Sequence, residues 1–206
     1  MPKLPWPPAT LPAAPTGQIL EEDSWLWRVY GFGGRHPANW NGFRTYGPVA
    51  SGRFDHHLPP PAEEPDRGIL YMAGDVATAI AETFQDTRTI DRVHQDPWLC
   101  AFRLEHDLPK LDLTGTWPTK AGASQAIATG RRDVARAWSR AIYAAFADVQ
   151  CLIYASSMSG GSTNVAIYER GEWTLPDRPA LNIPLSHPGL SSDLERIAET
   201  YGYDLR

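Results

Sequence analysis

Five short apolar runs, rich in β-branched and aromatic residues, are spread along the 206-residue chain. They cover residues 25–30, 68–73, 99–104, 151–155 and 164–168. Runs of this length and composition predict β-strands that are buried on at least one face.

Helical spacing predicts a short helix directly after the second run. Asp75 can accept a hydrogen bond from the first turn and so cap a helix over residues 76–84. Val76, Ile80 and Phe84 fall on one face of that helix, and Glu82 falls on the opposite face.

Two further segments have helical periodicity. Residues 131–149 place Val134, Trp138, Ile142 and Ala145 on one stripe, which predicts an amphipathic helix, and residues 192–201 predict a C-terminal helix. Strands and helices interleave without regular β-α-β order, so we expect an α/β or α+β domain with a mixed or antiparallel sheet and flanking helices. The chain has no glycine-rich Rossmann or P-loop fingerprint.

Proline marks two segments outside this pattern. Residues 1–17 hold six prolines and predict an extended arm, which is either a disordered tail or an arm that lies on a partner subunit in a homo-oligomer. Residues 58–65 form a second proline cluster and predict a surface loop. We therefore expect one folded domain over residues 18–206.

Composition excludes several classes of protein. A net charge of −5 argues against a nucleic-acid binder with a broad basic surface, and no apolar run is long enough to span a membrane. The N-terminal segment has no apolar signal core, and Cys100 and Cys151 lie in apolar runs that suit buried thiols, so we expect a cytoplasmic protein. The histidines show no metal-ligand spacing, so we expect no metal.

Several polar side chains stand where chemistry could take place. Glu82 has small neighbours on its helix, Arg28 interrupts an apolar strand, and Arg53 lies in a turn-rich loop. Tyr71 lies in a short strand, and Ser156 ends a strand before a Ser/Gly-rich loop. Each also has a structural interpretation: a solvated helix glutamate, an edge-strand arginine, a loop arginine, a core tyrosine and a hairpin serine.

Taken in order, these segments resemble the RES domain family, which is named for an Arg, a Glu and a Ser. The resemblance spans about residues 25–185 and includes an 11-residue step from Tyr71 to Glu82. The matching pieces are Trp27-Arg-Val-Tyr30, Ser51-Gly-Arg-Phe-Asp55, Leu70-Tyr-Met-Ala73, Ala79-Ile-Ala-Glu82, Ile153-Tyr-Ala-Ser-Ser157 and Gly161-Ser-Thr-Asn-Val-Ala-Ile-Tyr168.

The resemblance implies an ADP-ribosyltransferase-like fold and NAD as the substrate. It implies three catalytic residues: Glu82, which would stabilise positive charge on the ribose, Arg28, which would hold phosphate groups, and Ser156, which would bond the nicotinamide carboxamide or a ribose hydroxyl.

Four further residues would bind NAD. Arg53 would hold the pyrophosphate or an incoming phosphate, Tyr71 would border the nicotinamide, and Tyr30 and Asn164 belong to the matching segments.

The family includes toxins of bacterial toxin–antitoxin pairs. The resemblance therefore implies an NAD-degrading toxin that uses phosphate or water as acceptor and is inhibited by a helix-turn-helix antitoxin, so that contact with DNA would be indirect. One alternative is an ADP-ribosyltransferase that modifies a specific protein. Another is a non-catalytic nucleotide-binding module, since Phe54, Asp55 and Met158 depart from the family pattern.

Overall fold

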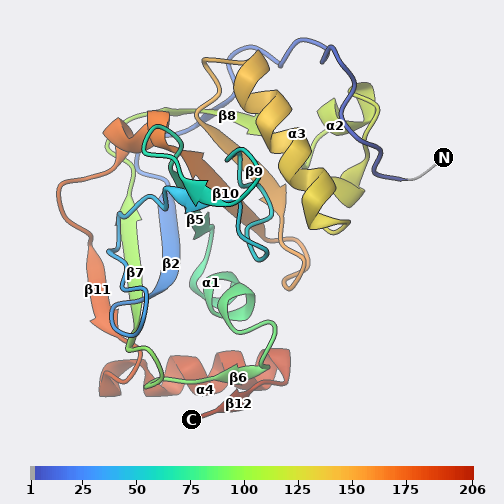
Figure 1. Ribbon diagram of the computed structural model, residues 1–206. Coiled ribbons are helices and arrows are strands. Elements are labelled where there is room, and N and C mark those ends of the chain that lie inside the picture. The colour runs from blue at the N-terminus through green and yellow to red at the C-terminus, as the bar shows by residue number, and fades with distance from the viewer. Residues whose placement is uncertain (1–2) are drawn as a thin grey trace.

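Eight strands form the central sheet in a computed structural model that describes residues 3–206 (Figure 1). Their order across the sheet is β1-β8-β9-β10-β5-β2-β7-β11. In chain order the strands are β1 Ile19–Leu20, β2 Trp25–Gly31, β5 Ile69–Ala73, β7 Pro97–Arg103, β8 Leu108–Asp112, β9 Cys151–Ala155, β10 Thr163–Tyr168 and β11 Leu181–Pro184.

The sheet is mixed and nearly divides in two. Only β8 and β9 pair in parallel, whereas the other neighbours are antiparallel. Strands β2 and β5 share a single register pair, Trp27 with Ala73, so the two halves of the sheet diverge there. This divergence opens space for a site beside the middle of the sheet.

Helices cover the two halves separately (Figure 1). Helix α3 (Arg132–Ala145) buries Val134, Trp138 and Ile142 in the core cluster that holds β9, and α2 (Trp117–Lys120) joins the same cluster. At the other end, α1 (Val76–Thr83) packs against β2 and β5, and α4 (Ser191–Tyr201) packs beneath α1. The predicted α+β class is confirmed.

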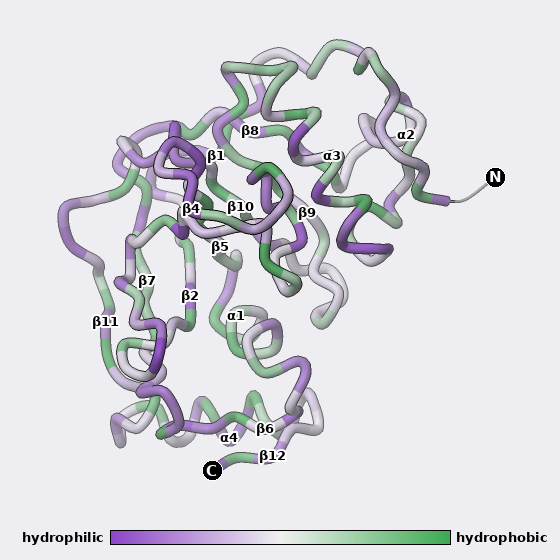
Figure 2. Tube along the Cα trace, in the orientation of Figure 1, coloured by the Kyte–Doolittle hydropathy of each residue, from purple (hydrophilic) through white to green (hydrophobic). Residues whose placement is uncertain are grey.

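Small elements complete the chain. Strand β3 (Tyr46–Gly47) pairs with β4 (Ala62–Glu63), and β6 (Thr89–Ile90) pairs with β12 (Asp204–Leu205). Three 3₁₀ turns are η1 (Gln125–Ile127), η2 (Glu169–Thr174) and η3 (Pro188–Leu190). Figure 2 shows that the loop carrying β4 and the segment before β11 are mainly hydrophilic, in agreement with the predicted surface loop at residues 58–65.

The five predicted strands and three predicted helices are all present. Asp75 caps α1 as expected, because its Oδ1 accepts the Thr78 amide at 2.8 Å. The helix predicted over residues 131–149 ends earlier, at Ala145, which is exposed. Cys100 and Cys151 are both buried, and burial raises the pKa of the Cys100 thiol to about 12.

The proline-rich arm packs on its own domain. The backbone carbonyl of Pro5 accepts a hydrogen bond from Trp138 Nε1 at 2.8 Å, and that of Ala13 accepts one from Trp117 Nε1 at 3.2 Å. Leu4 packs against the cluster around α3. The structure of residues 3–17 therefore differs from the expected disordered tail, whereas contact of the arm with a partner subunit stays a prediction; residues 1 and 2 lie outside the described part of the chain. Within residues 3–206 no helix is both long and apolar enough to cross a membrane.

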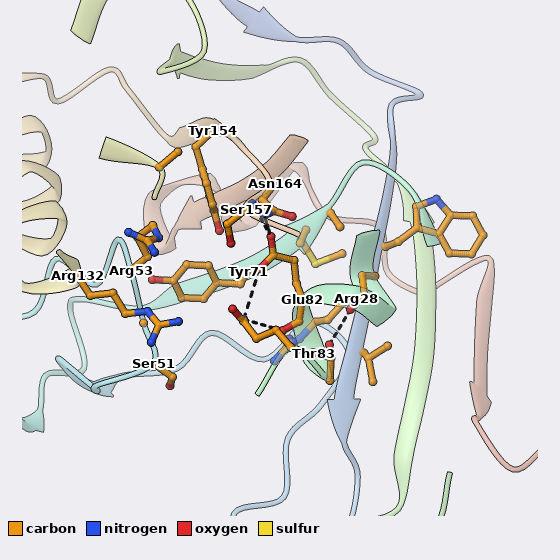
Figure 3. Close-up of a pocket in the computed structure, with 18 of the residues that line it drawn as sticks. Arg28, Ser51, Arg53, Tyr71, Glu82, Thr83, Arg132, Tyr154, Ser157 and Asn164 are labelled. Atoms are coloured by element: carbon orange, nitrogen blue, oxygen red, sulfur yellow. Dashed lines mark hydrogen bonds between the residues drawn. The ribbon is translucent and has the colours of Figure 1, made fainter. Parts of the chain in front are cut away.

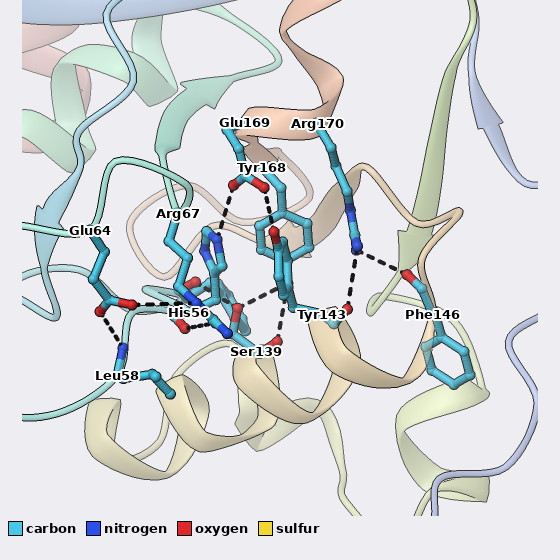
Figure 4. A network of polar contacts seen from close by, with 11 residues as sticks. His56, Leu58, Glu64, Arg67, Ser139, Tyr143, Phe146, Tyr168, Glu169 and Arg170 are labelled. Atoms are coloured by element: carbon cyan, nitrogen blue, oxygen red, sulfur yellow. Dashed lines mark hydrogen bonds and ion pairs between the residues drawn. The ribbon is translucent and has the colours of Figure 1, made fainter.

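A buried polar network joins α3 to the segment that follows Arg53 (Figure 4). Glu169 accepts the Tyr143 hydroxyl and lies 3.1 Å from His56 Nε2. Ser139 Oγ donates to the Phe54 carbonyl at 2.6 Å. The network thus holds residues 54–57 against the core.

His56 and its neighbour His57 are both fully buried. Burial lowers the pKa of each imidazole, and this effect outweighs the nearby carboxylates, Glu169 beside His56 and Asp55 beside His57. Neither ring nitrogen of His57 has a hydrogen-bond partner among the described residues. Both histidines are therefore held neutral in the folded protein.

This burial predicts a loss of stability in mild acid. Because the pKa of each histidine is lower when folded than its value of about 6.5 when unfolded, the unfolded chain binds more protons below that pH. The free energy of unfolding should fall as the pH drops from about 7.5 to 5.5, by up to about 1.4 kcal/mol per pH unit for each histidine. Urea unfolding across this range measures it.

A matched pair of variants tests the assignment to the buried rings. His57→Gln should flatten the pH dependence, whereas His94→Gln, at an exposed histidine, should leave it as in the wild type. Equal slopes for the wild type and His57→Gln would show that His57 contributes nothing to the acid sensitivity.

Candidate active site

A cleft of about 320 Å³ opens where β2 and β5 diverge (Figure 3). Its walls come from β2, the loop 44–53, β5, α1, the turn before α3, and the ends of β9 and β10. Five of the residues proposed from the sequence line it: Arg28, Arg53, Tyr71, Glu82 and Asn164.

Glu82 stands at the centre of the cleft on α1. Its Oε1 accepts hydrogen bonds from Ser156 Oγ at 2.6 Å, Asn164 Nδ2 at 2.8 Å and the Ser157 amide at 3.2 Å. Its Oε2 has only a long contact with Gln85 Nε2, at 3.4 Å, among the described residues. One oxygen is therefore fixed by the protein while the other is available to a ligand.

The position of the Glu82 carboxylate is set by the cap and the packing of α1 and by the pairing of β9 with β10. The Asp75 cap fixes the start of α1, and small residues such as Ala79 and Ala81 let the helix lie close to the sheet. β9 and β10 are paired so that Asn164 lies opposite Tyr154, next to the strand end that carries Ser156. Two segments more than 70 residues beyond Glu82 thereby reach its side chain.

The Ser156 hydroxyl donates one hydrogen bond and accepts two, all with groups of the protein. The hydroxyl donates to Glu82 and accepts the amides of Met158 at 3.1 Å and Ser159 at 3.0 Å. In the structure Ser156 holds Glu82, and its expected contact with NAD stays a prediction. The Met158 side chain packs against the apolar cluster of α1 and α4.

Arg28 reaches the cleft from β2. Its Nη1 lies within hydrogen-bond distance of the carbonyls of Asn39, Trp40 and Gly42, at 3.2, 3.2 and 3.3 Å. Burial lowers the pKa of this guanidinium to about 10, so it remains charged at neutral pH. The loop 39–42 thus orients the arginine without neutralising it.

Tyr30 lies outside the lining of the cleft, unlike its neighbour Arg28. Its side chain is buried, and its hydroxyl donates to Asn182 Oδ1 on β11 at 2.9 Å. The Arg28 guanidinium lies 5.7 Å from the centre of the Tyr30 ring. The structure therefore places Tyr30 as a support for Arg28.

Arg53 and Arg132 form a cationic side of the cleft, across Tyr71 from Glu82 in Figure 3. Arg53 Nη1 donates to the Gly130 carbonyl at 2.7 Å. Burial, and then the charge of Arg132, lower the pKa of Arg53. Two like charges on the same side of a cleft favour an anionic ligand between or beside them.

Tyr71 presents its ring to the cleft while its hydroxyl is bound below. The hydroxyl donates to Asp55 Oδ1 at 2.8 Å and accepts the Phe54 amide at 2.9 Å. Burial and the neighbouring Asp55 raise the pKa of Tyr71 well above its usual value. The Tyr71 side chain is therefore uncharged, and its ring lines the cleft in a fixed position.

Asp55 is the centre of the loop that carries Arg53. It is fully buried and also accepts Arg44 Nη2 at 2.6 Å and the Val49 amide at 2.7 Å. Gly52 is required beside it, because a Cβ at that position would lie 2.1 Å from Asp55 Oδ1. The segment Ser51–Asp55 thus folds around a buried carboxylate, and Phe54 fills the core next to it.

The charge balance of the cleft defines its ligand class. Four guanidinium groups line it, whereas Glu82 is the one carboxylate among its lining residues in the described chain; the four are Arg28, Arg44, Arg53 and Arg132. Asp55 neutralises Arg44 from below, which leaves three cations for a ligand. Such a site suits a molecule with phosphate groups and one centre of developing positive charge.

Within residues 3–206 no three His, Cys, Asp or Glu side chains form a group that could hold a metal ion.

Several lining residues were not proposed from the sequence. They include Arg132, Tyr154 and Gln85. Burial raises the pKa of Tyr154 strongly, so this tyrosine also stays neutral. The position of Arg132 at the first turn of a predicted helix was the one available signal.

Comparison with known proteins agrees with this geometry. A family model described as RES domain matches residues 26–186. No curated protein sequence matches the chain. A similar solved structure is described as the crystal structure of the M. tuberculosis MbcT–MbcA toxin–antitoxin complex, with 15% identity, a TM-score of 0.56, and coverage of 86% of this chain and 92% of that chain. This similarity confirms the predicted ADP-ribosyltransferase-like α+β fold.

Proposed function

Because the chain belongs to the RES domain family, we propose that its cleft binds NAD and cleaves the bond between nicotinamide and ribose. The observation that carries the proposal is the Glu82 carboxylate, fixed through one oxygen in a cleft otherwise lined by arginines. A dinucleotide supplies both the phosphate charge for the arginines and the sugar for the glutamate.

Cleavage of this bond requires a carboxylate that stabilises positive charge on the ribose more than an acid that protonates the leaving group. When the glycosidic bond breaks, its electron pair goes to the nicotinamide ring, which leaves as a neutral molecule. Positive charge then develops on the ribose, as in glycoside hydrolysis. Glu82 Oε2 is the group that would stabilise this charge, and Arg28 and Arg53 would hold the pyrophosphate.

The acceptor completes the reaction. An oxygen of water or of inorganic phosphate forms the new bond to the ribose carbon, and its proton is lost to solvent. Phosphate would enter through the cationic side formed by Arg53 and Arg132. Tyr71 would border the nicotinamide, and Asn164 would act through Glu82.

An enzyme that consumes NAD is toxic to the cell that makes it. We therefore infer that the chain is the toxin of a toxin–antitoxin pair, acts in the cytoplasm, and is held inactive by a cognate helix-turn-helix antitoxin. The similar structure is described as a toxin–antitoxin complex, which supports this partner class. Suppression of nicotinamide release by a small helix-turn-helix protein encoded beside this chain would identify the partner.

Incubation of the purified chain with NAD tests the activity. We expect free nicotinamide together with ADP-ribose in water, or a phosphorylated ADP-ribose when inorganic phosphate is present. A labelled protein band from labelled NAD and cell lysate would instead favour an ADP-ribosyltransferase. NAD that binds and is not turned over would overturn the enzymatic proposal in favour of a binding module.

Ser156 is expected to act by positioning Glu82. Ser156→Ala removes the shortest of the three hydrogen bonds to Glu82 Oε1 and should lower kcat about tenfold with little change in KM. Ser159→Ala is the control, because the Ser159 hydroxyl bonds Ser162 in the same loop and Tyr201 on α4 but not Glu82. Steady-state kinetics of nicotinamide release separate the two; a rise in KM alone would contradict the positioning role.

A further inference from the structure

The turn before α3 forms part of the cationic side of the cleft. Ala128 and Arg132 line the cleft, and the Gly130 carbonyl accepts Arg53 Nη1 at 2.7 Å. The position of this turn therefore sets where both arginines stand.

The N-terminal arm holds the same turn from outside. The Lys3 carbonyl accepts Ser124 Oγ at 2.5 Å, and the Pro5 carbonyl accepts Trp138 Nε1 at 2.8 Å. Between them lies Leu4, which packs on the core cluster around α3. Residues 3–5 thus contact both ends of the segment that contains Gly130.

Leu4 and Gly130 are in close contact. A Cβ on residue 130 would lie 3.1 Å from Leu4 Cδ2 and 2.7 Å from the Ala126 carbonyl oxygen. The second distance is too short for any side chain without a shift of the backbone. Glycine at this position allows Leu4 to pack against the turn whose carbonyl accepts the hydrogen bond from Arg53.

Arg53 and Arg132 carry like charges on the same side of the cleft. Burial, and then the charge of Arg132, lower the pKa of Arg53. Among the described residues, the Gly130 carbonyl is the hydrogen-bond partner that orients Arg53. A turn that can move would let the two cations separate and would weaken binding of an anion between them.

We propose that Leu4 and Gly130 are positioning residues for the anion-binding side of the cleft, so that the proline-rich arm is a functional part of the ligand site. The inference rests on the proposed function only for the identity of the natural ligand. Binding of a simple anion can therefore test it without any turnover.

The test compares two leucines of the arm in the full chain. Leu4→Ala should weaken binding of inorganic pyrophosphate, measured by calorimetry, about tenfold, which is the scale of one charge-assisted hydrogen bond. Leu11→Ala is the control: Leu11 packs on the same core cluster, but the side chain nearest to Gly130 is that of Leu4. Equal affinities for Leu4→Ala and Leu11→Ala, or no binding of pyrophosphate to the wild type, would overturn the proposal.

A second variant keeps the arm intact. Gly130→Ala must displace the turn, so it should cause a similar loss of pyrophosphate affinity while far-ultraviolet circular dichroism stays unchanged. If the wild type cleaves NAD, both variants should raise KM with kcat within about twofold, the pattern expected for lost uniform binding. If the wild type binds pyrophosphate but cleaves no NAD, the proposed function fails while the comparison of the leucine variants still decides the role of the arm.

Discussion

Glu82→Gln is expected to abolish most nicotinamide release, with a fall in kcat of about 10²- to 10³-fold, or about 3–4 kcal/mol of transition-state stabilisation. The glutamine has the same size as the glutamate, and its carbonyl oxygen can accept the hydrogen bonds that Ser156, Asn164 and the Ser157 amide now give to Oε1. The substitution therefore removes the charge while the geometry of α1 is kept.

The loss should appear in kcat rather than in NAD binding. Positive charge is present on the ribose mainly in the transition state, so the carboxylate stabilises that state more than the bound substrate. The arginines that would hold the pyrophosphate come from other elements and stay in place. Steady-state kinetics together with calorimetric binding of NAD separate the two effects.

Asp86→Asn is the matched control for this experiment. Asp86 is exposed and lies four residues after Glu82, so the variant removes one negative charge close to the same helix without touching the cleft. Its turnover should equal that of the wild type. Turnover by Glu82→Gln at the wild-type rate would remove Glu82 from the chemistry.

The convergence of residues at one site was expected from the resemblance to the RES domain family, whereas strand and helix patterns predicted only the elements that carry them. Arg28, Tyr71 and Asn164 each lie within a predicted strand, and Glu82 lies on the predicted helix. What could not be predicted was the direction of each contact. Ser156 turned to Glu82 because β9 and β10 pair in a register that only the folded sheet defines.

Other features depended on tertiary contacts that leave little trace in the sequence. Strands β1, β8 and β11 were not predicted; β1 has two residues, and β8 and β11 each include a proline within a short, partly polar run. The proline content predicted an extended arm, either disordered or lying on a partner subunit, and gave no sign that its carbonyls accept hydrogen bonds from two tryptophan indoles of its own domain. Arg132 joined the cleft because the turn before α3 folds back toward Arg53.

Asp55→Ala is expected to cost about 2–4 kcal/mol of folding free energy, the largest stability effect predicted for the site. Asp55 is fully buried and accepts hydrogen bonds from Arg44, the Val49 amide and the Tyr71 hydroxyl. The alanine would leave all three donors without their acceptor, and one of them carries a charge that is only about one-third exposed, at 32%. Urea unfolding measures the loss.

Two variants locate the origin of that loss. Asp55→Asn keeps an acceptor oxygen and removes the charge, so it should lower the free energy of unfolding less than Asp55→Ala does. The difference between the two variants measures the cost of the unpaired donors. The loss that Asp55→Asn still causes measures the ion pair with Arg44. Asp193→Ala breaks an exposed ion pair with Arg196 and should cost at most about 1 kcal/mol. If Asp55→Ala were no more costly than Asp193→Ala, the buried carboxylate would not be what holds the Arg44–Arg53 loop against Tyr71, and the position of the cationic side of the cleft would need another cause.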